Sequence, residues 1–311
     1  MTSALRSLIL LISCPDRKGI VAAVTRFIAD HNGNVLHLDQ HVDTEENVFF
    51  MRLEFEEQGF AIPANRLTEE FRRIADDFRM QWVLRRSDDV PRMAVFVSRE
   101  SHCLFDVLSR VQAGEWQVQV PLVIGNHEDL APVAERFGVR FETYPITKEN
   151  REEQERVELR RLAEERVDFV VLARYMQIVS PAFVNQFPNR VINIHHSFLP
   201  AFPGARPYHS AYARGVKIIG ATSHYVTSEL DTGPIIEQDI VRVTHRDSLE
   251  DFIRKGKDLE KIVLSRAIWW HLQHRVLVYS NKTVIFDGPA VARKKLPNTA
   301  SLQYSIRPIP A

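Results

Sequence analysis

The chain has 311 residues, of which 45% are hydrophobic and 26% are charged, a composition that is ordinary for a globular protein and excludes wholesale disorder. Basic and acidic residues number 40 each, so the formal net charge is zero and favours neither a nucleic acid nor an anionic membrane as the main partner. This length suits two domains of about 100–200 residues each.

The N-terminal segment carries no targeting signal that we recognise. Its apolar run, residues 8–12, is too short for the core of a signal peptide, and Pro15, Asp16 and Arg17 follow soon after. No stretch approaches the roughly 20 apolar residues that a membrane span needs. The two cysteines, Cys14 and Cys103, lie far apart in the sequence. This pattern predicts a protein of the reducing cytoplasm.

Residues 1–86 have the pattern of a small domain. Apolar residues with helical spacing occur in 20–28 and again in 67–78. In 48–56 apolar and charged residues alternate, which indicates a strand with one buried face and one polar face. The predicted strands are 8–12, 35–43, 48–56 and 80–84. Their order with the helices is βαββαβ, so we expect a ferredoxin-like fold.

A polar segment that ends in proline, residues 87–91, is predicted to link this domain to a second one. From 92 to 288 short apolar segments alternate with helical patterns, which predicts a Rossmann-like α/β domain with a mainly parallel sheet. Its predicted strands are 93–98, 120–125, 169–173, 191–195 and 218–226, and its predicted helices are 103–112, 130–137, 150–166 and 249–274. For residues 289–311 we expect a loosely ordered tail.

The densest group of reactive side chains lies in residues 191–200. An apolar strand brings Asn193 and His195 to the same side as the chain leaves the sheet, and His196 and Ser197 follow. Ligands bind at the carboxyl ends of the strands in open parallel sheets. Such a group of polar and titratable side chains at a strand end favours an active site over a loop of satisfied polar groups.

A second group of polar side chains belongs to the strand 218–226 and the turn after it. His224 lies in the strand, and Asp231 and Gly233 mark the turn. Asp-x-Gly is a frequent turn signature, so Asp231 alone would indicate no more than a turn. Its combination with the first group makes Asp231 a candidate catalytic residue.

These motifs resemble the signature of the folate-dependent formyltransferase superfamily. The resemblance extends over about residues 92–285 and rests on Asn193-Ile194-His195, Ser197, Leu199-Pro200, Gly220, Thr222, His224 and Asp231-x-Gly233. It implies that the catalytic residues are Asn193, His195 and Asp231. It also implies that the folate is contacted by His224 and by the segment of Met176, Gln177, Ile178 and Val179.

Formyl chemistry requires side chains of these types. A nucleophile attacks the formyl carbon while the formyl oxygen gains negative charge, and a hydrogen bond from Asn193 to this oxygen would stabilise the transition state by about 2.7–4 kcal/mol. His195 can polarise the carbonyl group or protonate the leaving nitrogen. Asp231 can orient His195 and accept a proton from the nucleophile, for which a raised pKa would be favourable.

The loop after the strand 93–98 favours one branch of the superfamily. Transferases that act on glycinamide ribonucleotide have a loop here that is rich in glycine and asparagine and binds the substrate phosphate through backbone N–H groups. Residues 98–105 contain no glycine and include the carboxylate of Glu100. This loop and His196 resemble the deformylase branch instead. His102 and His196 are therefore candidate neighbours of the active site.

The first domain resembles an ACT domain, a regulatory module that often binds amino acids between paired copies. The resemblance rests on Cys14-Pro15-Asp16-Arg17-x-Gly19-Ile20 at the start of a helix. It implies that Asp16 and Gly19 lie in an effector loop, although a plain turn at a helix start explains each of them alone equally well. Pairing of such domains implies a homo-oligomer.

The resemblance as a whole implies hydrolysis of 10-formyltetrahydrofolate to tetrahydrofolate and formate, with water as the nucleophile and without a metal or further cofactor. The formate would supply purine biosynthesis and balance the one-carbon folate pools. The expected partners are the folate substrate and an amino-acid effector, with neither nucleic acid nor membrane. The alternatives are a formyltransferase to an amine acceptor and an amino-acid sensor that binds folate without turnover.

Overall fold

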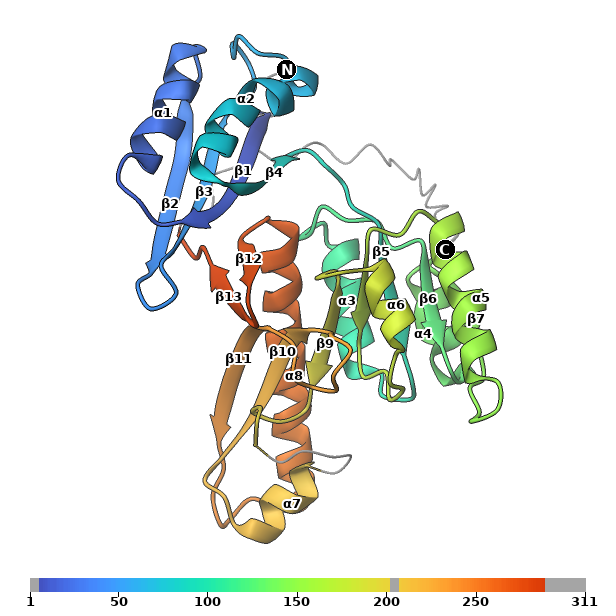
Figure 1. The fold of residues 1–311 in the computed structure, drawn as a ribbon. Coiled ribbons are helices and arrows are strands. Elements are labelled where there is room, and N and C mark those ends of the chain that lie inside the picture. The colour runs from blue at the N-terminus through green and yellow to red at the C-terminus, as the bar shows by residue number, and fades with distance from the viewer. Residues whose placement is uncertain (1–5, 202–206, 289–311) are drawn as a thin grey trace, which may run out of the picture. The chain divides into compact units, whose positions relative to one another are not determined.

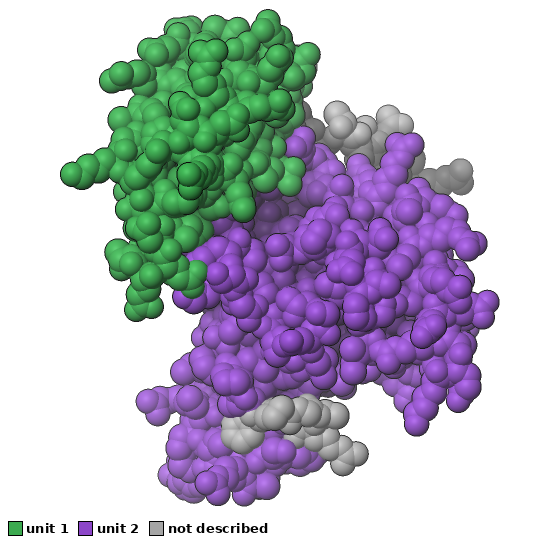
Figure 2. Space-filling model, viewed as in Figure 1, with its two compact units in different colours: residues 1–88, 288–311 green, residues 89–287 purple. Residues whose placement is uncertain are grey.

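The computed structural model describes residues 6–201 and 207–288, which form two compact units (Figure 2). Unit 1 contains the described residues 6–88 and Gly288, and unit 2 contains the described residues from 89 to 287. The predicted tail, 289–311, lies outside the described residues. Within the described ranges, none of the helices combines the length and the apolar character needed to cross a bilayer.

Unit 1 is a four-stranded antiparallel sheet with two helices (Figure 1). The strand order in the sheet is β2-β3-β1-β4. The elements in chain order are β1 (Ser7–Pro15), α1 (Ile20–Asp30), β2 (Val35–Asp43), β3 (Val48–Glu56), α2 (Ala64–Phe78) and β4 (Gln81–Arg86). This order confirms the predicted ferredoxin-like fold.

Both faces of β3 are buried, although only one of them was predicted to be. The apolar face, which includes Leu53, packs in one core cluster with residues of α1 and α2. On the other face Arg52 and Glu54 are 1% and 2% exposed. An ion pair of 2.9 Å joins them, and Ser7 Oγ donates a hydrogen bond of 2.6 Å to Glu54 Oε1. These contacts offset part of the cost of removing two charges from water.

Unit 2 is built on a seven-stranded sheet with the order β11-β10-β9-β8-β5-β6-β7. Its strands are β5 (Met93–Val97), β6 (Leu122–Gly125), β7 (Arg140–Thr143), β8 (Phe169–Leu172), β9 (Val191–His195), β10 (Ile218–Tyr225) and β11 (Ile235–Arg242). The five strands β5 to β9 are parallel, whereas β10 is antiparallel to both of its neighbours. The prediction of a mainly parallel α/β sheet is therefore confirmed.

Six α-helices and a hairpin complete the described part of unit 2. They are α3 (His102–Gln112), α4 (Ala131–Arg136), α5 (Arg151–Glu164), α6 (Pro181–Gln186), α7 (Pro207–Arg214) and α8 (Leu249–Leu272), and the hairpin of β12 (Val276–Tyr279) and β13 (Lys282–Ile285). A single 3-10 turn, η1 (Glu128–Leu130), precedes α4. The strands β7 and β11, the helices α6 and α7 and the hairpin were not predicted from the sequence.

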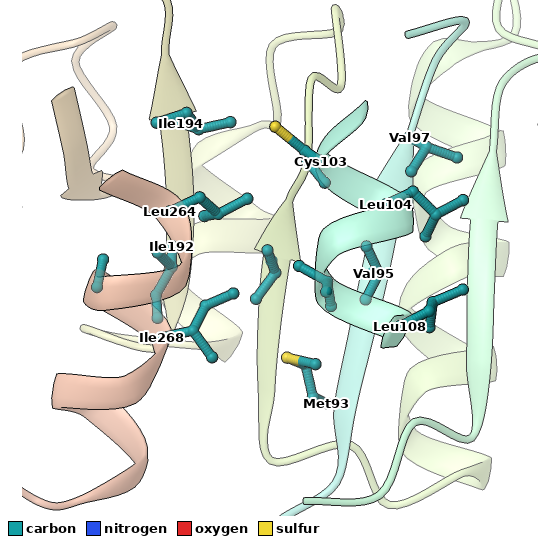
Figure 3. Packing of buried hydrophobic residues seen from close by; sticks show 14 of the residues in the cluster. Met93, Val95, Val97, Cys103, Leu104, Leu108, Ile192, Ile194, Leu264 and Ile268 are labelled. Carbon is teal, nitrogen blue, oxygen red and sulfur yellow. The ribbon is translucent and has the colours of Figure 1, made fainter. Parts of the chain in front are cut away.

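Helices α3 and α8 cover one face of this sheet (Figure 1). Figure 3 shows Leu104 of α3 and Leu264 and Ile268 of α8 beside Val95 and Ile192 of the sheet, and all five are at most 1% exposed. A second apolar cluster on the opposite face includes residues of α5 and α6. The central strands are thus buried on both faces, as their apolar sequences predicted.

The side of the sheet on which the chain adds successive strands changes between the neighbouring strands β5 and β8. From β5 it continues to β6 and β7 on one side, and from β8 it continues to β9 and β10 on the other. The loops after such a strand pair diverge at the carboxyl ends, which is where open α/β sheets bind their ligands. In unit 2 these loops begin at Ser98 and Ala173.

Candidate active site

Strands β9 and β10 bring two of the predicted site residues together. In their antiparallel pairing His224 lies opposite Asn193, and Thr222 lies opposite His195. Asn193 Nδ2 is 3.2 Å from His224 Nε2. His224 Nδ1 donates to the carbonyl oxygen of Tyr225 at 3.0 Å, so Nε2 is the nitrogen that accepts a hydrogen bond from Asn193.

Asp231 reaches this pair from the turn after β10. Its own backbone is left-handed, with φ of 55°, which asparagine and aspartate tolerate better than most residues. Two residues later, a Cβ on Gly233 would lie 1.8 Å from the carbonyl oxygen of Tyr225. Glycine is therefore required there for the turn to close against β10. The Asp-x-Gly motif is explained by this geometry.

The closest contact of Asp231 in the site is with His195. Asp231 Oδ2 lies 3.3 Å from His195 Nδ1, and Asp231 Oδ1 lies 3.8 Å from His224 Nε2. His195 itself is 6% exposed, and its Nε2 has no hydrogen-bond partner among the described residues. A buried imidazole with one nitrogen held by a carboxylate and the other unoccupied can exchange a proton with a substrate.

The hydrogen bond from His195 holds the pKa of Asp231 well below its usual range, against the opposing effect of burial. A raised pKa, which would favour proton acceptance by Asp231, is therefore not found. The reason is that the hydrogen bond from His195 stabilises the carboxylate more than partial burial destabilises it. Asp231 is ionised at neutral pH and suits the role of orienting His195.

Thr222, which the sequence placed only in the family signature, organises the loop after β9. Its Oγ1 accepts hydrogen bonds from Leu199 N at 3.0 Å and from Gln238 Nε2 at 2.9 Å. The same hydroxyl donates to the carbonyl oxygen of Ser197 at 2.9 Å. One fully buried side chain thus anchors the chain that leaves His195 and His196.

The predicted folate-contacting segment follows β8. The side chains of Met176 and Ile178 are 47% and 54% exposed, and Gln177 and Val179 are partly buried. The segment is fixed at its start by Ser98 Oγ, which accepts a hydrogen bond of 2.9 Å from Met176 N. Two large apolar side chains held at the surface on an anchored loop are suited to contact an apolar ligand.

His196 and His102 lie in different surroundings. The ring of His196 is 5.2 Å from that of His195 and 6.1 Å from that of Tyr208. His102 begins α3, and its Nε2 is 2.8 Å from Glu260 Oε2. Sequence reasoning missed Glu260 and Tyr208. A signal for Glu260 was available in the sequence, since it falls on the apolar stripe of α8. The structure shows that the residue is fully buried.

A pocket of about 170 Å³ lies beside His196. Its walls come from the loop after β9, from α7 and from β10 and β11, and they are almost entirely apolar. Residues 202–206, which lie between two of the lining residues in the sequence, are not described.

Among the residues that the structure describes, the side chains that come closest to a metal-binding arrangement are His102, Cys103 and Glu260, whose ligand atoms lie within 4.8 Å of one another. Both carboxylate oxygens of Glu260 already have partners in Tyr208, His102 and Arg174. Burial raises the pKa of the Cys103 thiol well above its usual value, so the thiol stays protonated. Contacts within the protein thus occupy both carboxylate oxygens of Glu260.

In unit 1, Asp16 and Gly19 lie in the turn between β1 and α1. Asp16 is partly buried, and its backbone N–H donates to the carbonyl oxygen of Asn47 at 2.9 Å. Gly19 is exposed, and its φ of 96° lies in the left-handed region at the start of α1. The turn is thus well formed.

Comparison with known proteins assigns each unit. A family model described as formyl transferase matches residues 91–268, and a model described as ACT domain matches residues 8–75. The chain is 53% identical over 277 residues to a formyltetrahydrofolate deformylase of Synechocystis, covering 89% of this chain and 97% of that protein. It is 48% identical over 279 residues to one of Bacillus subtilis, covering 89% and 93%.

Solved structures of a deformylase and of a transformylase are also similar to this chain. The crystal structure of a formyltetrahydrofolate deformylase from Pseudomonas syringae has a TM-score of 0.89 and 46% identity, covering 92% of this chain and 96% of that one. A glycinamide ribonucleotide transformylase from Symbiobacterium toebii has a TM-score of 0.59 and 33% identity, covering 64% of this chain and 95% of that one.

Proposed function

The chain belongs to the formyl transferase family, as a formyltetrahydrofolate deformylase that hydrolyses 10-formyltetrahydrofolate to tetrahydrofolate and formate, and we propose that Asn193, His195 and Asp231 carry out this hydrolysis. The observation that carries the proposal is the contact of 3.3 Å between His195 Nδ1 and Asp231 Oδ2, which leaves His195 Nε2 available in a buried position.

His195 is the proton-transferring residue in this proposal. The ionised Asp231 accepts the hydrogen bond of Nδ1–H, so Nε2 of the neutral ring has a free lone pair. Nε2 takes a proton from the attacking water and then delivers it to the folate nitrogen as the bond from that nitrogen to the formyl carbon breaks. Asp231 stabilises the imidazolium that exists between the two transfers.

Asn193 stabilises the charge that forms on the formyl oxygen. The Nδ2 amide group has two hydrogens, and the contact with His224 Nε2 uses only one of them. The second can be donated to the oxygen as it becomes negative. His224 thus fixes the orientation of the Asn193 amide, so that little reorganisation is needed during the reaction.

Turnover of formyl-folate in the absence of any amine tests the function. We expect the protein to release formate and tetrahydrofolate in equal amounts from 10-formyltetrahydrofolate and water alone. Formate is measured with a coupled formate dehydrogenase and the folate product by absorbance. Turnover that begins only after an amine is added would show a transferase instead, and saturable folate binding without turnover would show a sensor.

Met176, Gln177, Ile178 and Val179 are proposed to contact the folate, together with His224. The exposure of Met176 and Ile178 on a loop anchored to Ser98 supports this assignment. We expect Met176→Ala and Ile178→Ala to raise the KM for formyl-folate with little effect on kcat, because lost apolar contact weakens substrate and transition state alike. An unchanged KM in both variants would place the folate elsewhere.

For unit 1 we propose binding of an amino-acid effector near Asp16 and Gly19, and pairing of ACT domains into a homo-oligomer. The ACT family match supports both. The test is the rate of formate release with each amino acid added in turn, for the full chain and for a chain lacking residues 1–86. A response that survives the deletion would place the effector site in unit 2.

We further propose that the protein acts in the cytoplasm, where its formate supplies purine synthesis and its turnover balances the one-carbon folate pools. A strain without the gene should then need added formate or purine when no other source of formate is present. Growth that does not depend on either supplement would contradict this role.

A further inference from the structure

One face of helix α5 contacts the loop that includes the folate-contacting segment, residues 176–179. The face is formed by Arg151, Glu155 and Glu158, which are spaced by four and three positions and therefore lie along one side of the helix. The proposed mechanism uses none of these three side chains. Each of them contacts a residue at or within the ends of the segment, so we examine what these contacts do for folate binding.

Two of the contacts are made to the backbone of the loop. Arg151 Nη2 donates a hydrogen bond to the carbonyl oxygen of Ile178. Glu155 Oε1 accepts a hydrogen bond of 2.7 Å from the backbone N–H of Ser180. A cation thus binds a carbonyl group, and an anion binds an N–H group two residues later. Hydrogen bonds to charged groups are about twice as strong as those between neutral groups. We call Arg151 and Glu155 the α5 pair.

The third contact is made to the residue before the segment. The hydroxyl group of Tyr175 interacts with the carboxyl group of Glu158, and the two residues are 7% and 2% exposed. The ring of Tyr175 packs against Phe96 of β5, with ring centroids 5.3 Å apart. Ser98 Oγ accepts the N–H of Met176 next to it. The start of the segment is therefore fixed by the core, whereas its end depends on the α5 pair.

These contacts explain why two large apolar side chains remain at the surface. Tyr175 is buried, Met176 and Ile178 are exposed, and Gln177 and Val179 are partly buried, so exposure alternates along the segment. Burial of Met176 and Ile178 on the protein itself would be favourable, because it removes apolar area from water. A backbone bound from the α5 side keeps these side chains directed away from the helix.

Helix α5 is itself held firmly on the sheet. Leu162 is 0% exposed, and it lies with Leu159 in the same apolar cluster as Val170 and Leu172 of β8. Strand β8 is the one from which the loop begins. The α5 pair thus connects the loop to a packed element of the same domain, and binding sites on such elements keep their geometry better than sites on free loops.

We propose that Arg151 and Glu155 are positioning residues for folate, which hold residues 176–179 in the conformation that binds formyl-folate. The inference rests on the proposed function and on its assignment of this segment to folate contact. Without the α5 pair the segment occupies the binding conformation only part of the time, and the apparent affinity falls by that fraction. The proton transfers at His195 take place on another strand, so kcat should change little.

Steady-state kinetics with 10-formyltetrahydrofolate tests the proposal first. We expect Arg151→Ala and Glu155→Ala each to raise KM by about threefold to tenfold, with kcat within about twofold of the wild type. Glu155→Gln keeps an oxygen that can accept the N–H of Ser180, so it should restore most of the wild-type KM. Arg151→Ala and Glu155→Ala change the charge in opposite directions. An electrostatic effect on the anionic folate would therefore shift KM in opposite directions, whereas loss of positioning raises it in both.

The matched controls are Glu153→Ala and Arg160→Ala. Both positions are exposed on α5, and each control removes the same charge as one variant of the α5 pair. Their KM values should equal that of the wild type. Thermal unfolding of all variants shows whether a change in KM follows a loss of global stability, which the proposal does not expect.

Hydrogen exchange measures the loop without turnover. In Glu155→Ala the peptide that contains Ser180 should exchange faster than in the wild type, while peptides of β8 and β9 keep their rates. Saturating tetrahydrofolate should restore the protection, because bound folate orders the segment. In Glu155→Gln the protection should be close to that of the wild type.

A double-mutant cycle tests whether the α5 pair acts through the exposed side chains. In the Ile178→Ala background, Glu155→Ala should raise KM by a smaller factor than in the wild type, because the contact that it positions is already lost. Equal factors in the two backgrounds would show that Glu155 acts elsewhere.

Three further results would overturn the proposal: an unchanged KM in both alanine variants of the α5 pair, shifts of KM in opposite directions, or unchanged exchange at Ser180. Each can occur while wild-type enzyme releases formate and Ile178→Ala raises KM. The positioning role, the folate-contact assignment and the hydrolase function can therefore fail separately.

Discussion

His195 Nδ1 and Asp231 Oδ2 lie 3.3 Å apart, and this contact fixes both the tautomer and the orientation of the imidazole that we propose as the catalytic one. The pKa of Asp231 is lowered because the carboxylate is the hydrogen-bond acceptor for that ring. The activity should therefore depend on the charge at position 231 more than on the size of the side chain.

We expect Asp231→Asn to lower kcat by about 10³–10⁴-fold while the dissociation constant for folate changes little, because an amide no longer selects the tautomer with a free Nε2. Steady-state kinetics and a folate titration measure the two effects. The control is Asp239→Asn, which changes a partly exposed carboxylate of β11 that is paired with Arg266. This variant should keep normal turnover. Near-normal turnover of Asp231→Asn would remove Asp231 from the mechanism.

We expect unit 2 to become less stable as the pH rises, because of Glu158. Burial, with Glu155 adding to it, raises the pKa of Glu158 to about 8. The folded state therefore holds a proton between the unfolded pKa, about 4.3, and pH 8, and the free energy of unfolding falls across that window. Glu158→Gln keeps the neutral form at every pH. It should match the wild type near pH 4 and exceed it in stability at pH 8 by about 4 kcal/mol.

Urea unfolding at pH 4, 6 and 8 checks this expectation. The control is Glu153→Gln, an exposed position on the same helix, which should not change the pH dependence of stability. A stability difference between Glu158→Gln and wild type that is the same at all three pH values would show that Glu158 is not protonated in the folded state.

Thr222→Val should destabilise unit 2 by about 2–4 kcal/mol, because the N–H of Leu199 and the carbonyl oxygen of Ser197 lose their buried partner. The loop after His195 and His196 loses its anchor as well, so kcat should fall. Thr222→Ser keeps the hydroxyl group and should retain most of the activity. A larger loss in Thr222→Ser than in Thr222→Val would mean that the methyl group of Thr222, rather than its hydrogen bonds, is what matters.

Gly256→Ala should lower the free energy of unfolding by about 1–3 kcal/mol, although alanine is the better helix former. The added methyl group would overlap the ring of Tyr208, which its hydrogen bond to Glu260 holds in place. Thermal unfolding measures the change. Asp258→Ala, at an exposed position of the same helix, serves as the control and should cost little. A more stable Gly256→Ala variant would show that Tyr208 can move away freely.

Much of the fold could be predicted from residue patterns. The alternation in residues 48–56 and the short apolar segments 93–98 and 191–195 indicated strands because burial on one or two faces leaves a distinct pattern. The direction of β10 could not be predicted in this way, since an antiparallel strand that is buried on both faces has the same composition as a parallel one. Strand β7 was missed because its four residues, Arg140–Thr143, lie at the sheet edge and are only partly buried.

Some residues of the candidate site could likewise be predicted from the sequence, and others could not. Asn193, His195, His224 and Asp231 could be named from the sequence because they belong to two short motifs, and the structure brings them together. The partners of Glu260 could not be named. They come from three separate elements, and only the packing of α3, α7 and α8 makes them neighbours. The lowered pKa of Asp231 likewise depends on distances that no sequence pattern contains.

The pairing of β9 with β10 also determines which parts of this enzyme can vary. Asn193 and His224 face each other because of the ladder register, and the length of chain between the strands has no part in it. A change in the length of the connection between β9 and β10 should therefore leave this pairing intact. A single-residue deletion inside β10 would instead turn His224 to the opposite face of the sheet, and no compensating change in the connection could restore it.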